Sequence, residues 1–268
     1  MIPVSVVIIT KNEAHCIADC IGMAKLITDD IVLVDNGSTD STLHIAALNG
    51  CRIYQHHWEG YGANKNFGID LAKYDWILSL DADEVPDMEL VNSLHNLWLR
   101  NPETVYDIKF KAYFGDKQVR FGVWGRDHHV RLFNRTLVRW SESIVHETLQ
   151  MPKGMRRKML QGHVHHYSVK DAGECRLKAV YYAKLSAEKY FQIGKRSNLV
   201  NMYLSPLFVF VKSYILLLGF LDGKQGLEIS RTTYKNRRIK YHYLNLLEHR
   251  YKNLPVIKGN FAVDVKFH

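Results

Sequence analysis

Four short apolar runs, each followed by a helical pattern, occupy the first hundred residues and limit the folds open to the chain. The runs are VSVVIIT at 4–10, DIVLVD at 30–35, RIYQH at 52–56 and WILSLD at 76–81. Helical patterns follow at 17–26, 41–48, 63–72 and 88–99. Unbroken apolar runs are typical of strands buried on both faces, and crossovers between parallel strands are right-handed. The pattern therefore predicts an α/β, Rossmann-like domain with a mostly parallel sheet.

Polar residues follow three of these strands directly, at 10–13, 35–40 and 81–84. In an open α/β sheet, ligands bind at the carboxyl ends of the strands. No G-x-G-x-x-G follows the first strand and no G-x-x-x-x-G-K-[ST] occurs in the chain. These absences argue against an NAD-type dehydrogenase and a P-loop NTPase.

The sequence DADE at 81–84 places three acids at the end of the fourth strand. Their carboxylates repel one another unless a cation lies among them, and hard oxygen ligands suit Mg²⁺ or Mn²⁺. Such an ion usually takes one or two protein carboxylates and leaves positions for phosphate oxygens. The alternative, a solvated acidic loop that caps the next helix, fits Asp87 better than Asp81 or Asp83.

The pattern changes after residue 105. Shorter β-like runs with many aromatic, Arg and His residues extend from 106 to 167 and predict an antiparallel extension of the sheet. A helical pattern covers 169–194, and an apolar segment at 199–223 contains Pro206 and Lys212. Because Lys212 lies near its middle, an in-plane or hairpin helix is a better interpretation than a membrane-spanning one.

The basic residues are concentrated near the C-terminus. The formal net charge is +9, and residues 224–258 contain nine Lys and Arg but only two acids. A cationic segment beside an apolar one suits an anionic membrane surface. The start of the chain resembles a first strand and not a signal peptide. We therefore expect a cytoplasmic protein that is peripheral on the inner face of the cytoplasmic membrane, with its four cysteines reduced.

Several sequence blocks together resemble glycosyltransferase family 2, whose members have the GT-A fold. The blocks are VSVVIITKNEAHCIADCI, DIVLVDNGSTDSTLHIA, WEGYGANKNFGIDLA and WILSLDADE, with RLFNR, VHE and GFLDGKQG farther along the chain. The later blocks are most similar to the β-1,4-glucosyltransferases of lipopolysaccharide inner-core synthesis. The resemblance covers nearly the whole chain and implies a UDP-sugar donor and a divalent cation, Mg²⁺ or Mn²⁺.

The resemblance also implies roles for individual residues. Uridine would be held by Thr10, Glu13 and Asp35, with Lys65 near the base or the diphosphate. Asp81 would contact the ribose or the metal, and Asp83 would be a metal ligand. One of His163, His165 or His166 would complete the metal site, and His165 is taken as that ligand. Glu147 would be the catalytic base, since displacement at the anomeric carbon requires a carboxylate that takes the acceptor proton.

Alternatives remain for several of these residues. Asp127 is the second candidate for the base. Ser38, Thr39 and Asp40 are capping residues in the simplest interpretation. Each histidine has the alternative of a satisfied side chain packed beneath aromatic rings. Arg126, Arg131 and Arg135 suit an anionic acceptor or the diphosphate, or else form ordinary ion pairs on a strand.

We expect two domains, a GT-A catalytic domain at 1–168 and a helical membrane-associating region at 169–268. The donor half would be 1–105 and the acceptor half 106–168. The expected reaction is inverting transfer of a hexose, glucose from UDP-glucose, to a lipid-linked glycan such as lipopolysaccharide heptose. The alternatives are a protein or polysaccharide acceptor, or a protein that binds nucleic acid or membrane on an inactive scaffold. No RNA-binding motif supports a nucleic-acid partner.

Overall fold

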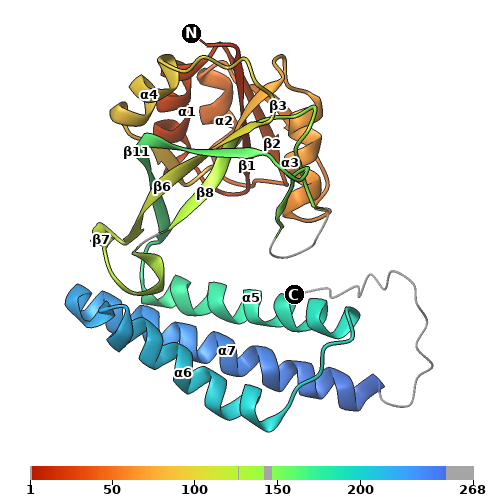
Figure 1. Ribbon diagram of the computed structural model, residues 1–268, viewed down its shortest axis with the longest axis vertical. Coiled ribbons are helices and arrows are strands. Elements are labelled where there is room, and N and C mark those ends of the chain that lie inside the picture. The colour runs from red at the N-terminus through yellow and green to blue at the C-terminus, as the bar shows by residue number, and fades with distance from the viewer. Residues whose placement is uncertain (1, 126, 142–146, 252–268) are drawn as a thin grey trace.

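The computed structural model describes residues 2–125, 127–141 and 147–251. One mixed sheet with helices on both faces forms the N-terminal part, and a layer of long helices lies below it in Figure 1. The sheet order is β3-β2-β1-β4-β8-β6-β11-β5, with β7 paired to β6. The predicted α/β fold is confirmed.

The first half of the sheet is parallel, as its apolar runs predict. Its strands are β1 (Val4–Thr10), β2 (Asp30–Asp35), β3 (Arg52–Gln55) and β4 (Trp76–Asp81). The crossover helices are α1 (Ile17–Ile27), α2 (Thr42–Leu48) and α3 (Tyr61–Asp70), and α4 (Met88–His95) follows β4. Every residue of β1 and β2 is buried, because helices cover both faces of the sheet.

Helix α3 packs unusually close to the sheet at Gly68. A Cβ atom there would lie 2.6 Å from Val7 Cγ1 and 2.8 Å from Val34 Cγ2, so only glycine fits. The helix begins and ends two residues before the predicted 63–72, and Gly60 with a φ of 111° precedes it. Helix α4 ends at His95, four residues before the predicted end.

The second half of the sheet corrects one prediction. Strands β8 (His128–Asn134) and β6 (Thr104–Phe114) form antiparallel pairs, as expected, and β7 (Lys117–Val119) makes a hairpin with β6. Strand β11 (Arg156–Val169) is instead parallel to β6. The chain recrosses the domain through the small hairpin of β9 (Arg139–Trp140) and β10 (Leu149–Gln150), and so enters β11 in the direction of β6. Strand β5 (Glu84–Pro86) pairs with β11.

A helical layer follows the sheet. It contains α5 (Ala172–Gln192), the π-helix η2 (Val200–Leu204), α6 (Ser205–Val211), the π-helix η3 (Lys212–Leu216), the short 3₁₀ turn η4 (Gly219–Asp222) and α7 (Gly223–Tyr251). Figure 1 shows α5 nearest to the sheet and α6 on the far side. Strand β11 ends one residue after the predicted domain boundary at 168.

The block GFLDGKQG joins the two layers. The buried Asp222 carboxylate accepts hydrogen bonds from the backbone N–H groups of Arg120 and Phe121, just before the turn η1 (Gly122–Trp124). A Cβ atom at Gly226 would lie 1.8 Å from the Gly219 carbonyl oxygen, so α7 also requires a glycine there. The block therefore has a structural role in fixing the helices against the sheet.

Among the described residues, no single helix has the length and apolar character needed to cross a membrane. Two consecutive helical segments, Val200–Leu216 and Gly219–Tyr251, meet the length and hydropathy criteria when they are taken together. They are bent by 70° where they join. The four cysteines are free thiols, as expected. Burial raises the pKa of the Cys51 thiol to about 11, which leaves little reactive thiolate at neutral pH.

Candidate active site

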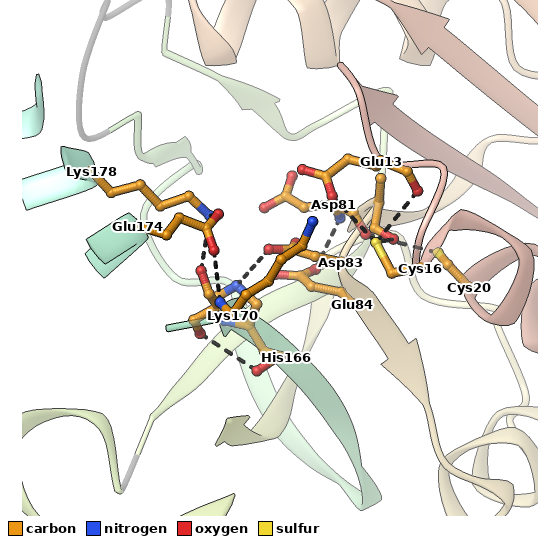
Figure 2. Close-up of polar contacts among 12 residues, drawn as sticks. Glu13, Cys16, Cys20, Asp81, Asp83, Glu84, His166, Lys170, Glu174 and Lys178 are labelled. Carbon is orange, nitrogen blue, oxygen red and sulfur yellow. Dashed lines mark hydrogen bonds and ion pairs between the residues drawn. The ribbon is translucent and has the colours of Figure 1, made fainter. Parts of the chain in front are cut away.

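The three acids of DADE, which are labelled in Figure 2, have different partners. Glu84, the first residue of β5, is almost completely buried and forms an ion pair with the buried Arg131 of β8. Its second carboxylate oxygen accepts a hydrogen bond from the backbone N–H of Asp81, at 3.0 Å. Glu84 therefore stabilises the end of β4 and is not free to bind a ligand.

Asp81 lies between two cations. Its carboxylate is 3.1 Å from Lys65 Nζ and 3.4 Å from Arg131 Nη2. Burial opposes ionisation of this carboxyl, but the charges of Lys65 and Arg131 outweigh it and hold the pKa of Asp81 well below its usual value. The cations that relieve the repulsion among these acids thus come, in part, from the protein itself.

Lys65 connects Asp81 to Glu147. Its buried ammonium is 3.0 Å from Glu147 Oε1 and 4.6 Å from the centre of the Trp140 ring. These four residues line a cavity of about 480 Å³ with the start of β8. The structure therefore brings together the predicted base and two predicted donor-binding residues, which are far apart in the sequence.

Asp83 has a histidine partner on β11. Its Oδ2 atom is 3.3 Å from His166 Nε2. Burial lowers the pKa of His166, but the hydrogen bond to Asp83 and the charges of Asp83, Glu84 and Asp81 dominate and raise it to about 9. Both residues line a second cavity of about 560 Å³, between the sheet and helices α5 and α7.

The structure places His166, and not the predicted ligand His165, beside Asp83. Neighbouring side chains of a strand point to opposite faces, and β11 directs His166 toward Asp83. His165 Nδ1 is instead 2.8 Å from the Tyr113 hydroxyl, with the two rings stacked. His163 also lies elsewhere, 3.4 Å from Asp87 Oδ2.

The residues at Asp83 fit a divalent cation. Neighbouring ligands of an octahedral ion with bonds of about 2.1 Å are roughly 3 Å apart, which is close to the 3.3 Å between Asp83 Oδ2 and His166 Nε2. The adjoining cavity leaves room for phosphate oxygens and water as further ligands. A carboxylate with an imidazole suits Mn²⁺, and Mg²⁺ would use mainly the carboxylate.

Two residues of the predicted uridine site have unused binding capacity. The Thr10 hydroxyl at the end of β1 is buried and has no hydrogen-bond partner within the described parts of the chain, so a ligand at this edge would satisfy it. Glu13 is partly exposed. Burial, assisted by the Asp83 charge, raises the pKa of Glu13. A carboxyl group that is protonated more readily repels a neighbouring anion less strongly.

Asp35 has a more structural environment than its predicted role implies. Its carboxylate accepts hydrogen bonds from Gly37 N at 2.9 Å, Ser38 N at 3.0 Å and the Ser38 hydroxyl. The capping interpretation holds for Asp40, which accepts from the backbone N–H of Thr42. Asp35 therefore shapes the turn after β2, and any contact with a nucleoside would be additional.

Asp127 lines the same cavity as Asp83 and His166. Its Oδ2 atom is 2.9 Å from His129 Nε2, and its side chain is about half exposed. Burial acts against ionisation, but the hydrogen bond and charge of His129 lower the pKa of Asp127. Both base candidates therefore lie at the ligand edge of the sheet, in different cavities.

The arginines expected to meet an anion have other partners. Arg131 is buried against Glu84 and Asp81, as described above. Arg135 donates to the carbonyl oxygens of Ile69 and Ala72 and pairs with Asp75. Both are structural, and Arg126 lies outside the described residues.

Sequence reasoning missed the contribution of α5. Lys178 lies 2.9 Å from Glu174 Oε1 and within electrostatic range of Asp83 and Glu13 (Figure 2). Burial lowers its pKa, but Glu174, Asp83 and Glu13 together raise it. Tyr182, one turn farther along the helix, is 2.7 Å from the Tyr61 hydroxyl. Only the helical spacing of 178 and 182 hinted that they share a face.

The chain is similar in sequence to several known proteins. An uncharacterized glycosyltransferase of Rickettsia typhi is 28% identical over 98% of this chain and 94% of its own. The lipopolysaccharide core biosynthesis glycosyltransferase LpsC of Rhizobium meliloti is 27% identical over 84% of this chain and 88% of its own. The structure of S. aureus TarS with UDP-GlcNAc covers 94% of this chain and 92% of its own, at 14% identity and a TM-score of 0.44.

The model of the family described as glycosyl transferase family 2 matches residues 5–163, more than half of the chain. This match covers nearly all of β1, all of β2 to β10 and the first part of β11, and it includes the three acids at 81–84 and His163. The chain is a glycosyltransferase that belongs to family 2.

Proposed function

We propose that the protein transfers a hexose, glucose in the first instance, from a UDP-hexose to a lipid-linked glycan with inversion at the anomeric carbon. The observation that carries this proposal is the pair of Asp83 and His166, which face a cavity at the carboxyl ends of the strands. Lipopolysaccharide core heptose is the proposed acceptor because of the similarity to LpsC. The reaction would take place at the cytoplasmic face of the membrane.

The residues around the two cavities suit the departure of UDP and the binding of the acceptor. When bound, a divalent ion on Asp83 and His166 would stabilise the negative charge of the departing UDP. Lys178 adds a cation at the same cavity, and Thr10 offers a hydroxyl to the nucleoside. The acceptor would enter through the cavity between the sheet and the helical layer and place its hydroxyl where that cavity meets the one lined by Glu147, beside Asp81 and Asp83.

Glu147 is the proposed base. Its ion pair with Lys65 fixes the carboxylate at the cavity wall, and its side chain is 16% exposed against 49% for Asp127. General-base catalysis requires a carboxylate that is held within reach of the acceptor hydroxyl. Phosphates of the donor would compete for Lys65 and free the carboxylate.

A pair of variants separates the two candidates. Glu147→Gln should lower kcat for hexosyl transfer by about 10²–10⁴-fold and leave UDP affinity no weaker than in the wild type, since Lys65 loses a competing carboxylate. Asp127→Asn, the matched control, should lower kcat by less than about ten-fold. Transfer is measured with radiolabelled UDP-glucose, and lipid A-core extract and a peptide pool are compared as acceptors. A larger loss in Asp127→Asn would assign the base to Asp127, and labelling of the peptides alone would refute the lipid-linked acceptor.

A further inference from the structure

One face of the helical layer is left uncovered by the residues that the structure describes. The helices η2, α6 and η3 form a continuous rod on the side away from the sheet (Figure 1). Its apolar side chains recur at helical spacing, and Val200, Leu204, Leu207, Phe208, Ile215 and Leu216 are each more than half exposed. Residues 199–218 contain no acid and a single cation, Lys212. A continuous exposed apolar surface of this kind marks an interaction site.

A cluster of cations lies beside one end of this rod. Lys240 of α7 is 4.4 Å from the centre of the Tyr190 ring and 4.9 Å from that of Tyr241. Lys195, just after α5, is also 4.4 Å from the Tyr190 ring, and Arg237 is 5.8 Å from the Tyr241 ring. Three cations thus share two aromatic side chains.

No ion pair with a carboxylate joins Lys195, Arg237 or Lys240 to any described residue. Lys240 is only 7% exposed, and a buried ammonium usually has an anionic partner. Burial, reinforced by the charge of Arg237, lowers the pKa of Lys240 although Tyr190 opposes this. The cluster therefore has excess positive charge that an external anion would compensate.

The cluster and the apolar rod adjoin each other. Arg237 Nε donates a hydrogen bond to the hydroxyl of Ser205, the first residue of α6, at 2.9 Å. Met202 of η2 packs with Tyr241 in a small core between the helices. A ligand with an anionic head beside an apolar surface would contact both features at once.

We propose that this side of the helical layer binds an anionic lipid bilayer. The rod lies in the interfacial layer of the membrane, and Lys195 and Arg237, backed by Lys240, hold a lipid phosphate. Amphipathic in-plane helices bind membranes by this combination of apolar burial and cationic attraction. Helix α7 packs against the rod and also lines the cavity, so the active site would lie one helix layer, about 10 Å, above the headgroups. That height suits a glycan acceptor that extends from a lipid. This last point rests on the proposed function.

Vesicle co-sedimentation of the full chain tests the proposal without any need for activity. The vesicles are phosphatidylcholine with about one third phosphatidylglycerol, compared with phosphatidylcholine alone. The wild type should bind the anionic vesicles and bind the neutral ones at least about ten-fold more weakly. Lys195→Gln with Arg237→Gln should weaken anionic binding about 25-fold, at roughly five-fold per cation. Lys153→Gln with Lys158→Gln is the charge-matched control on the catalytic domain.

The apolar contribution is tested separately. Leu207→Ser with Phe208→Ser should weaken binding by at least about 30-fold, whereas Leu48→Ser, at an exposed position of α2, should change nothing. Failure of the wild type to bind anionic vesicles would overturn the proposal, as would equal losses in the test and control variants. Binding of inorganic phosphate that displaces the protein from vesicles would reassign the cluster to a soluble phosphate. A dimer lost in the Leu207→Ser, Phe208→Ser variant, without vesicle binding, would show that a second copy covers the rod.

Discussion

An Asp83→Asn variant is expected to transfer hexose at least about a thousand-fold more slowly than the wild type. The amide keeps the size of the side chain but loses the charge that would hold a divalent cation beside His166. The loss should appear in kcat at saturating UDP-glucose and Mn²⁺. The assay is the release of UDP in the presence of acceptor extract.

The matched control for this variant is Asp116→Asn, at an exposed position in the turn between β6 and β7, which should retain full activity. Asp116→Asn should melt with the wild type. Asp83→Asn should melt somewhat lower, because it loses the ion pair with His166, but it should stay folded because it keeps the buried Glu84–Arg131 pair. Retention of more than about a tenth of the wild-type rate by Asp83→Asn would exclude Asp83 as an essential metal ligand.

An Arg131→Met variant is expected to lose about 3–5 kcal/mol of unfolding free energy. Arg131 and Glu84 are both buried, and removal of the guanidinium leaves the Glu84 carboxylate without its cation. For a chain of this size the loss corresponds to a melting temperature lower by roughly 10 °C. Thermal and urea unfolding of the ligand-free protein measure it.

Two further variants show whether the unpaired Glu84 carboxylate causes the loss of stability. Glu84→Gln combined with Arg131→Met should be more stable than Arg131→Met alone, because no unpaired charge remains at Glu84. Arg139→Met breaks the exposed pair with Asp70 and should cost less than about 1 kcal/mol. If the double variant is no more stable than Arg131→Met, packing rather than charge accounts for the loss.

The parallel half of the sheet and its ligand edge were predictable from the sequence. Apolar runs buried on both faces have a local signature, and the residues that follow them must meet at one edge. For this reason the pattern places Thr10 and Asp81 at this edge, where β1 and β4 end in the structure. The contacts of the site residues could not be predicted in this way, because Lys65 and Glu147 are 82 positions apart and no local rule pairs them.

The direction of β11 and the contribution of α5 could not be read from the sequence. Whether β11 is parallel to β6 depends on how the chain recrosses the domain, a non-local property. That direction in turn decides which histidine of the strand faces Asp83, so alternation alone could not choose His166 over His165. Lys178 joins the site because α5 begins directly after β11 and turns back over the end of that strand, where Lys178 Nζ donates a hydrogen bond to the Ser168 carbonyl oxygen at 2.9 Å.

The central claim, a metal-dependent UDP-sugar site at the carboxyl ends of β1 and β4, is tested most directly by calorimetric titration of the wild type with UDP. The titration is made once with Mn²⁺ and once with EDTA. The predicted result is saturable binding of one UDP with Mn²⁺ that weakens at least about ten-fold in EDTA. Equal affinity under both conditions would contradict the metal site, and no binding under either would contradict the UDP-sugar site itself.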